Sequence, residues 1–459
     1  MAKVSKASKR SKKTTKKITK KVRAPKALKV SKPAKRAKGP KAAKASGAPR
    51  IKGTPWKTDK WFVSPWNYEP EVVKQFKFPP AKDIKIHDIT LRDGEQQAGI
   101  AYSLEDKLRI ARALAEAGVH RIETGMPAVS KVDEAAIKEI VQANFGPDIF
   151  AFSRCMVSDV KLAKECGVKG VVVEIPSSEH IIKHAYGWEL QKAIDLSIEA
   201  TLLAKELGLY TVWFPIDASR ADLNWFLDLI EEIATKGHLD ALAVVDTFGG
   251  ISPHAVPYLI KKIRERVKKP LEPHFHDDFG MGVANTLMAL ACGCTVAHTT
   301  VTGIGERAGN AAMEELVLAL LTMYGIDIGI KTEKFYALSK LVRELSCTTI
   351  PSNRPIVGET LLSVESGIVA SWVRRCRAEN PLELGPFVPS LVGQRPIEIV
   401  MGKSSGIDSV ADWLERMNVD ASLEQREAIV LKVKEASIQK KGLLTEEEFR
   451  KIYDSVAHG

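Results

Sequence analysis

Two histidines separated by one residue are the sharpest chemical feature of the sequence. His274 and His276 lie in EPHFH (272–276), which Asp-Asp-Phe-Gly follows. Because alternate residues of a strand face the same side, both imidazoles can reach one metal ion. Asp93 would add a carboxylate, and two histidines with one carboxylate suit Mn, Mg, Zn, Co or Fe(II). Histidine pairs are more often structural than ligating, but the added carboxylate favours a metal site here.

Further polar side chains follow other short apolar segments, at the points where strands would end. If those strands are parallel neighbours, the side chains share one edge of a sheet and can build a single site. They are Arg92 and Gln96 in TLRDGEQ (90–96), Glu123 in HRIET (120–124), Arg154 after IFAFS (149–153) and Thr247 after ALAVVD (241–246).

A glycine-rich segment, GIGERAGN (303–310), follows the last of these apolar segments. Its three glycines allow a tight loop whose backbone N–H groups can meet an anion. Glu306 and Asn310 offer polar side chains in the same loop. An ordinary connecting loop is the alternative, and the polar loops elsewhere favour a functional one.

Short apolar strands alternate with amphipathic helices from Asp83 onward, which predicts βα units around a parallel sheet. Eight units over roughly 250 residues are typical of an α/β TIM, or (β/α)8, barrel, whose catalytic groups lie at the carboxyl ends of its strands. A doubly wound open sheet is the alternative, but the phosphate-binding glycine turn that it would need after the first strand is missing. The expected strands are 84–90, 120–124, 149–153, 170–175, 210–214, 241–246, 272–276 and 295–301.

The catalytic barrel is expected over residues 83–330, and a smaller region of helices and loops over 331–459. In this second region, TEEE before FRKIY predicts a helix start, with Thr445 as the cap and acidic residues in the first turn.

Residues 1–52 are expected to form a disordered, lysine-rich tail. Residues 1–50 hold 20 of the 68 Lys and Arg and no Asp or Glu, so the rest of the chain has 48 basic and 56 acidic residues. Such a tail can bind nucleic acid or another polyanion through counterion release, or it can be a solubilising or targeting extension. The sequence favours neither.

An aromatic arm is expected at residues 53–82, where Trp56, Trp61, Trp66 and Tyr68 lie among prolines. Such an arm more readily packs on the body or on a partner subunit than binds a ligand. The six scattered cysteines lack the paired spacing of a structural zinc site, and no apolar run approaches the ~18–20 residues of a membrane span. We therefore expect a cytoplasmic protein with reduced thiols and no membrane partner.

Three segments carry a resemblance to a known family. HDITLRDGEQQAG (87–99), HFHDDFGMGVANTLMAL (274–290) and TGIGERAGNAAMEELVLAL (302–320) are similar to signature regions of the DRE-TIM metallolyase superfamily. That superfamily includes isopropylmalate, citramalate and homocitrate synthases, with hydroxymethylglutaryl-CoA lyase and pyruvate carboxyltransferases as relatives. The resemblance covers about residues 83–330 and continues more weakly through PSNRPIVGE, ESGI and MGKSSG, which favours the synthase branch.

The resemblance implies a role for each matching position. Asp93, His274 and His276 match metal ligands, with Asn310 as a fourth or outer contributor. Arg92 matches the arginine that stabilises the carbonyl or enolate oxygen. The remaining positions are Arg154 for a distal substrate carboxylate, Thr247 for the 2-oxo acid, Gln96 and Glu123 for the pocket wall, Glu306 for proton relay, and Asp277 as a further catalytic candidate.

Four positions depart from the synthase pattern. Val369 and Ser404 stand where synthases commonly have histidine, in ESGIV and MGKSSG, and Ile216 stands where they commonly have glutamate. The change at Val369 removes a histidine that serves in proton transfer, frequently across a subunit interface. Asp277 replaces an asparagine and is closer to the lyase pattern, whereas GIGERAGN lacks the cysteine that lyases require in that loop.

Three functions follow, in order of preference. The first is a Claisen condensation of acetyl-CoA with a 2-oxo acid, releasing CoA, by a homodimer or higher homo-oligomer that uses Mn, Mg, Zn or Co. The second is a metal-dependent carbon–carbon lyase or aldolase on the same barrel. The third is a polyanion-binding protein in which the tail is primary and the barrel secondary.

Overall fold

Eight parallel strands form the core of the protein. The computed structural model describes residues 54–458, so the tail predicted at 1–52 lies outside the described residues. The strands pair in the order β7-β6-β5-β4-β3-β2-β1-β8, and every pair is parallel. Their bounds are β1 Lys85–Asp88, β2 Arg121–Glu123, β3 Asp148–Arg154, β4 Gly170–Pro176, β5 Tyr210–Ile216, β6 Ala241–Asp246, β7 Leu271–Phe275 and β8 Val296–Thr299.

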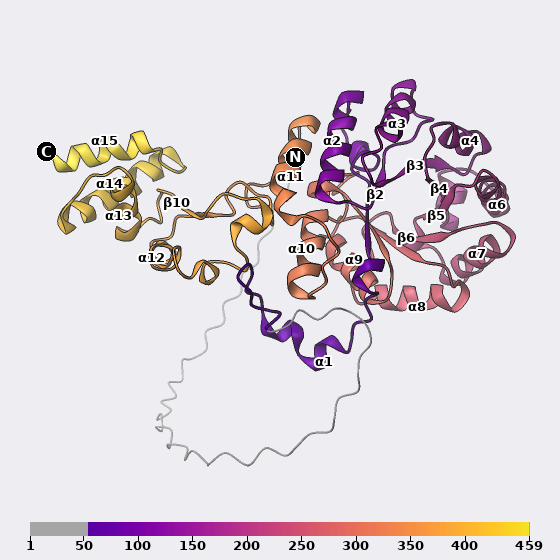
Figure 1. Cartoon of the computed structure of the whole chain (residues 1–459), viewed down its shortest axis with the longest axis horizontal. Helices are drawn as coiled ribbons and strands as arrows, with labels where there is room; N and C mark the ends of the chain where they lie inside the picture. The colour runs from indigo at the N-terminus through magenta and orange to yellow at the C-terminus, as the bar shows by residue number, and fades with distance from the viewer. Residues whose placement is uncertain (1–53, 459) are drawn as a thin grey trace, which may run out of the picture. The chain divides into compact units, whose positions relative to one another are not determined.

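The sheet closes where β7 meets β8. Just before β8, the N–H of Thr295 donates to the carbonyl of Leu271 over 3.1 Å. Beyond the carboxyl ends of both strands, Ala311 joins them: its N–H donates to Phe275, and its carbonyl accepts from Thr300, each over 3.2 Å. With helices around the strands (Figure 1), these contacts confirm the predicted (β/α)8 barrel.

Amphipathic helices cover the outside of the barrel. In the first of them, Ser103 and Asp106 form a capping box, and the helix ends at Gly118 in the left-handed conformation. The barrel helices are α2 Leu104–Ala117, α3 Lys131–Ala143, α4 Val157–Glu165, α5 Glu179–His184, α6 Leu190–Glu206, α7 Leu223–Lys236, α8 Val256–Arg266, α9 Gly282–Ala291, α10 Met313–Met323 and α11 Phe335–Ser346.

Several strands are shorter than the apolar pattern predicts. The first was expected over 84–90 but ends at Asp88, and the last was expected over 295–301 but ends at Thr299. The reason is visible in the first strand, where Asp88 Oδ1 accepts from the N–H of Thr90 over 3.0 Å and turns the chain out of the ladder. The residues that were expected in these strands but lie beyond their ends belong to the loops that carry the polar side chains.

The barrel interior is apolar on one side and polar on the other. Strands β3 to β6 contribute an apolar cluster that includes Phe152, Val172 and Phe214. Strands β1, β2, β7 and β8 instead bury charged or titratable side chains, whereas barrel interiors are usually filled by branched apolar residues. The buried polar residues on these four strands include His87, Arg121, Glu123, Glu272, His274 and His298.

The C-terminal region is mainly helical and has a core of its own, built around Trp413 and Phe449. Thr445 caps the last helix as predicted, because its Oγ1 accepts from the N–H of Glu448 over 3.3 Å. Two strands of two residues each, too short to leave a pattern in the sequence, pair here in parallel. The elements are β9 Ser363–Val364, α12 Gly367–Cys376, β10 Glu398–Ile399, α13 Ile407–Arg416, α14 Leu423–Lys440 and α15 Glu446–Ala457.

The aromatic segment before the barrel packs on the body through some of its rings. It contains the one-turn helix α1 (Pro70–Val73). Trp61 is buried, and the hydroxyl of Tyr68 donates to the carbonyl of Thr322 over 2.6 Å. Trp66, by contrast, is 75% exposed. Among residues 54–458, no helix combines the length and apolar character needed to cross a membrane.

Candidate metal and substrate site at the barrel mouth

Asp93, His274 and His276 meet at the carboxyl end of the barrel, as the sequence predicts. The Nε2 atoms of the two histidines are 3.3 Å apart, and they lie 3.6 and 3.8 Å from Oδ2 of Asp93. All three side chains are buried, and together they form a group that could hold a metal ion. Ligand atoms about 2.1 Å from a common ion lie roughly 3.0–3.6 Å apart, so this triangle is close to the size that a divalent cation requires.

The electrostatics of His274 also suit a cation. Burial, followed by the neighbouring charges of His276 and His298, holds the pKa of His274 well below its usual range. The imidazole of His274 is therefore neutral at neutral pH, and a neutral imidazole is the form that ligates a metal. Neither His274 Nδ1 nor His276 Nδ1 has a hydrogen-bond partner among the described residues.

Asn310 holds the carboxylate of Asp93 in place. Its Nδ2 donates to Oδ1 of Asp93 over 2.8 Å, which leaves Oδ2 directed at the two imidazoles. The backbones of His276 and Asn310 form an antiparallel β-bridge, which joins the end of β7 to the glycine-rich loop. Asn310 Oδ1 is buried without a hydrogen-bond partner in the part of the chain that the structure describes. Asn310 thus contacts the ligand group and keeps one oxygen free.

The loop GIGERAGN packs against Asp93 so closely that glycine is needed in it. A Cβ on Gly305 would lie 2.3 Å from Nδ2 of Asn310 and 3.0 Å from Oδ1 of Asp93. A Cβ on Gly309 would lie 1.8 Å from the carbonyl oxygen of Gly303, and all three glycines have positive φ. The glycines therefore bring the backbone onto the candidate metal ligands.

Arg92 lies beside the metal triangle and is held from several sides. Its Nη1 donates to Oδ2 of Asp93 over 2.8 Å and to Oε1 of Gln96 over 3.2 Å, and its Nε donates to Glu123. Its guanidinium carbon is 4.1 Å from the ring centre of Phe152. Nη2 of Arg92 is buried and has no hydrogen-bond partner among the described residues. This leaves one fixed cationic donor available to a substrate oxygen.

Glu123 is the carboxylate that orients Arg92. Burial raises the pKa of Glu123, but the charge of Arg92 and interaction with His87 outweigh that effect and lower the pKa to about 2. Glu123 is therefore ionised throughout the neutral range. Its Oε2 lies 3.2 Å from Nε2 of His87, which continues the polar contacts into the barrel.

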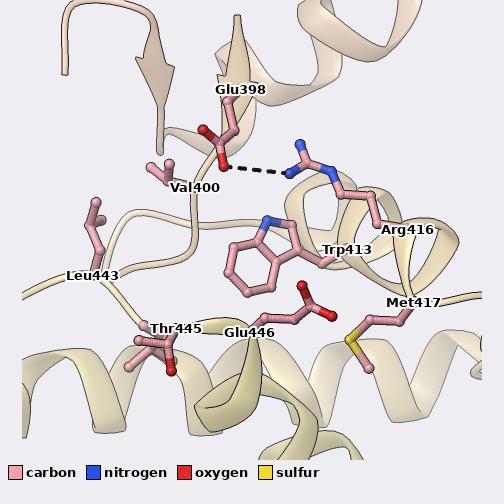
Figure 2. A pocket seen from close by; sticks show the side chains of 9 residues that line it. Glu398, Val400, Trp413, Arg416, Met417, Leu443, Thr445 and Glu446 are labelled. Atoms are coloured by element: carbon pink, nitrogen blue, oxygen red, sulfur yellow. Dashed lines mark ion pairs between the residues drawn. The ribbon is translucent and has the colours of Figure 1, made fainter. Parts of the chain in front are cut away.

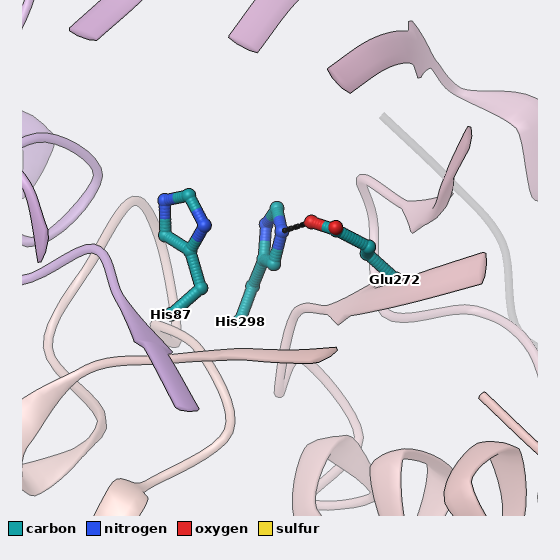
Figure 3. A group of neighbouring side chains, drawn as sticks. All are labelled: His87, Glu272 and His298. Atoms are coloured by element: carbon teal, nitrogen blue, oxygen red, sulfur yellow. Dashed lines mark hydrogen bonds and ion pairs between the residues drawn. The ribbon is translucent and has the colours of Figure 1, made fainter. Parts of the chain in front are cut away.

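A second buried group, formed by His87, Glu272 and His298, lies in the barrel interior (Figure 3). His298 Nε2 is 3.1 Å from Oε2 of Glu272, and the rings of His87 and His298 have centres 4.5 Å apart. The other oxygen of Glu272 accepts from Nη1 of Arg121 over 2.9 Å. Glu272 thus connects His298 to Arg121, and the group forms part of a buried chain of polar side chains that runs from Arg92 to Arg121.

The remaining predicted site residues have partners that limit their roles. Nε of Arg154 pairs with Asp159 Oδ2 over 2.8 Å, although the Arg154 side chain remains 53% exposed. Oγ1 of Thr247 accepts from the N–H of Asp217 over 2.8 Å. Asp277 Oδ1 accepts from the N–H at the start of α9 over 2.6 Å, so its carboxylate is engaged by the helix. Glu306 is half exposed in the glycine-rich loop.

A separate hollow lies in the C-terminal region (Figure 2). It contains none of the strand-end residues described above, and Arg416 and Glu398 face each other across it with an N–O distance of 3.8 Å. It is lined by Glu398, Val400, Trp413, Arg416, Met417, Leu443, Leu444, Thr445 and Glu446. The chemistry of the strand ends therefore belongs to the barrel mouth and not to this hollow.

Comparison with known proteins identifies the family. The HMGL-like family matches residues 83–342, which include every ligand of the candidate metal site. The chain belongs to the HMGL-like family. It is 37% identical over 397 residues to homocitrate synthase AksA of Methanothermobacter thermautotrophicus, covering 86% of this chain and 98% of that protein.

Two further relatives of this HMGL-like protein come from Methanocaldococcus jannaschii. The (R)-citramalate synthase CimA is 38% identical, covering 77% of this chain and 70% of the relative. The 2-isopropylmalate synthase is 34% identical, covering 76% and 67%. Among solved structures, a hydroxymethylglutaryl-CoA lyase from Pseudomonas aeruginosa matches with a TM-score of 0.53 at 22% identity, covering 59% of this chain and 95% of the lyase. That likeness shows the shared barrel fold.

The sequence pattern missed several polar residues of the site. Glu174, near the end of β4, points to the barrel mouth, and His87, Glu272 and His298 line the interior. A signal existed for each of them, because a charged or imidazole side chain within an otherwise apolar strand needs a partner or a function. In GVVVEI (170–175), Glu174 is the one charged residue.

Proposed function

We propose that this protein is an acyltransferase that condenses acetyl-CoA with a 2-oxo acid and releases CoA. The observation that carries the proposal is the Asp93, His274 and His276 triangle beside a fixed Arg92, in a chain whose synthase relatives match most of its length. Those relatives are homocitrate, (R)-citramalate and 2-isopropylmalate synthases.

Asp93, His274 and His276, with Asn310 beside them, would hold a divalent cation. Mn, Mg, Zn and Co are the candidates, because the donor set mixes nitrogen and oxygen. Bound there, a divalent cation supplies Lewis acidity to the keto group of the 2-oxo acid.

Arg92 supplies the other positive charge at this site. Its Nη2 has no hydrogen-bond partner among the described residues, and Glu123, Asp93 and Gln96 hold the guanidinium in place. Attack on a keto carbon places negative charge on its oxygen, and a preorganised donor stabilises that charge without reorganisation. Arg92 therefore binds the oxygen more strongly as the carbon–carbon bond forms.

The other predicted residues would bind the two substrates. Arg154, at the end of β3, has an exposed guanidinium for a distal carboxylate of the 2-oxo acid. Thr247 follows β6, and its backbone carbonyl accepts from Arg307 of the glycine-rich loop. Residues 306–308 of that loop are exposed, and we place the acyl-CoA on their side of the mouth.

The test is an assay of the purified protein with acetyl-CoA and a panel of mono- and dicarboxylic 2-oxo acids. Thiol release is followed with each of the four metals in turn. Release of CoA that depends on both a 2-oxo acid and the metal is expected. Silence across the panel, together with cleavage of a preformed 3-hydroxyacyl-CoA or 4-hydroxy-2-oxo acid, would establish a lyase or aldolase instead.

Three further expectations accompany this function and stay predictions. They are assembly as a homodimer or higher homo-oligomer, a cytoplasmic location, and binding of nucleic acid or another polyanion by residues 1–52. The last rests on the excess of lysine and arginine in that segment.

A further inference from the structure

The condensation needs a base, and two positions where synthases commonly carry histidine or glutamate are apolar in this chain. Val369 is on α12, and Ile216 ends β5 beside the apolar cluster of the barrel interior. Neither side chain can accept a proton. Another residue of the mouth is therefore the candidate base for the acyl methyl group.

Most carboxylates around the mouth are already engaged. Asp93 faces the two histidines, and Glu123 is bonded to Arg92. Asp246 accepts from the backbone N–H groups of Gly250 and Ile251, each over 3.1 Å. The others with partners are Asp159, with Arg154; Asp217, with Arg220; Asp277, with the start of α9; and Asp278, with Arg307.

Glu174 is different, because its carboxylate has no hydrogen bond or ion pair within residues 54–458. It lies on β4, two residues after Val172 of the barrel interior, so its side chain points to the same inner face. Its register partners on the neighbouring strands are Arg154 of β3 and Phe214 of β5. The side chain is thus at the carboxyl end of the strand, between the substrate-binding arginine and the apolar half of the barrel.

The surroundings of Glu174 also tune it for proton transfer. Burial raises the pKa of Glu174 to about 7, against the lowering effect of Arg92 and Arg154. A base is most effective when its pKa is near the working pH, because it is then both available and basic enough. The charged and titratable groups that face it are Arg92, Asp93, Arg154, Glu306 and Tyr186.

We propose that Glu174 is the catalytic base that removes a proton from the methyl group of acetyl-CoA. This proposal rests on the condensing function proposed above. The methyl C–H bond breaks, the proton passes to a carboxylate oxygen of Glu174, and the released electron pair forms the new bond to the keto carbon. The keto oxygen then takes a proton, and water hydrolyses the thioester to release CoA.

Glu306 is the rival for this role. It is also a carboxylate near the mouth, but it is half exposed, and its Oε2 lies 3.6 Å from Nη1 of Arg307. Glu306 is thus in contact with water and beside a guanidinium, whereas Glu174 is less exposed and has no hydrogen bond or ion pair among the described residues. If Glu174 is the base, E174Q should lose activity and E306Q should keep it. If Glu306 is the base, the reverse is expected.

The experiment compares E174Q, E306Q and wild-type full-length protein, each loaded with metal, on acetyl-CoA and the 2-oxo acid that gives the fastest CoA release. The control is Glu206→Gln, which changes an exposed glutamate at the end of α6. Four quantities are measured: kcat, KM for the 2-oxo acid, metal content, and deuterium uptake into the methyl group in D2O. We expect E174Q to lose about 100- to 10,000-fold in kcat and in exchange, the usual contribution of a general base.

In the same variant, KM for the 2-oxo acid should stay within about threefold and the metal content should not change, because Glu174 acts on the other substrate. In wild type, kcat should fall as the pH drops below about 7, because a protonated carboxyl cannot accept a proton, and this limb should be absent from the residual activity of E174Q. E174D, which keeps the acid and is one methylene shorter, should retain the pH limb with a lower kcat. If E174Q does not fold, this variant carries the test.

Several outcomes would overturn the assignment. Wild-type kcat and exchange in E174Q would exclude Glu174 as the base, and loss of exchange in E306Q alone would transfer the role to Glu306. If the wild-type protein itself releases no CoA from acetyl-CoA, the condensing function fails and the role of Glu174 fails with it. If the wild type and E174Q are both active, only the role of Glu174 is refuted, and the condensing function stands.

Discussion

Asn310 donates from Nδ2 to Oδ1 of Asp93 over 2.8 Å, although the two residues are 217 positions apart in the sequence. This contact fixes which oxygen of Asp93 faces His274 and His276. The loop after the last strand therefore decides the geometry of a carboxylate that follows the first strand. The geometry of the candidate metal site therefore depends on closure of the barrel.

The first prediction concerns the ligands themselves. His276→Ala should lower metal affinity by more than about 100-fold, the upper end of the loss seen when only an outer contact is removed. The measurement is metal per chain after gel filtration, by elemental analysis. His254→Ala, which changes an exposed histidine, is the control and should keep one ion per chain.

The same measurement tests the second buried group. We expect His298→Gln to keep one ion, because His298 is not part of the Asp93, His274 and His276 triangle at the barrel mouth. Two ions in wild type and one in that variant would show that His87, Glu272 and His298 also hold a metal.

The second prediction concerns the close approach of the glycine-rich loop. A Cβ on Gly305 would lie 2.3 Å from Nδ2 of Asn310, and the backbone there has φ of 153°. Gly305→Ala should therefore displace Asn310 from Asp93 and weaken metal binding by about 10- to 100-fold, as the loss of an outer contact does. Titration with Mn²⁺ followed by electron paramagnetic resonance measures the affinity.

Gly442→Ala is the matched control, because nothing lies within 4 Å of a Cβ added there. Unchanged affinity in the Gly305 variant would mean that the amide of Asn310 does not orient Asp93.

The third prediction concerns Glu123, whose ionised carboxylate holds Arg92. Glu123→Gln leaves a buried guanidinium short of one counter-charge, and breaking a buried pair in this way costs about 3–5 kcal/mol. We expect urea unfolding to show that loss, and kcat to fall while KM for acetyl-CoA changes little. Glu232→Gln breaks the ion pair with Lys236 on the surface of α7 and should cost less than about 1 kcal/mol. Equal losses in the two variants would contradict a special role for the buried pair.

The sequence was sufficient for the barrel and for the three residues of the candidate metal triangle, and insufficient for Glu174. His274 and His276 could be identified because their alternate spacing and their place at the end of a strand are visible within a few residues of sequence. Arg92 and Glu123 are 31 positions apart, and Arg121 and Glu272 are 151 positions apart. A local sequence pattern cannot predict either pairing. Glu174 escaped notice because one acid in an apolar strand does not show which side of the sheet it faces.

The fourth prediction concerns the lysine-rich segment. Removal of residues 1–52 should leave kcat and metal content unchanged, because the proposed catalytic groups all lie within the barrel. If the segment binds a polyanion, the deletion should abolish retention on heparin or duplex DNA, and binding by the full chain should weaken steeply between about 50 and 200 mM salt. A variant with the lysines of the segment changed to glutamine separates charge from length. Equal retention of all three proteins would exclude polyanion binding by the segment.

The last prediction uses Glu314, a fully buried carboxyl in the first turn of α10. Burial raises its pKa to about 7, and Oε2 accepts from the N–H of Thr302 over 3.1 Å. The folded state thus binds a proton that the unfolded state, with an ordinary pKa near 4.5, releases earlier. The stability that Glu314 contributes is full below pH 4.5 and is lost as the pH rises through about 7.

Glu314→Gln removes this titration and keeps an oxygen for Thr302, so its advantage over wild type should grow from near zero at pH 4.5 to as much as about 3 kcal/mol at pH 8. Asp88 and Glu174 also have raised pKa values, so they too lower the stability of the wild type as the pH rises from 4.5 to 8. The test is therefore the difference in unfolding free energy between Glu314→Gln and wild type, and not the wild-type curve alone. Urea unfolding of the metal-free proteins at several pH values measures it. A constant difference across that range would mean that Glu314 does not titrate on unfolding.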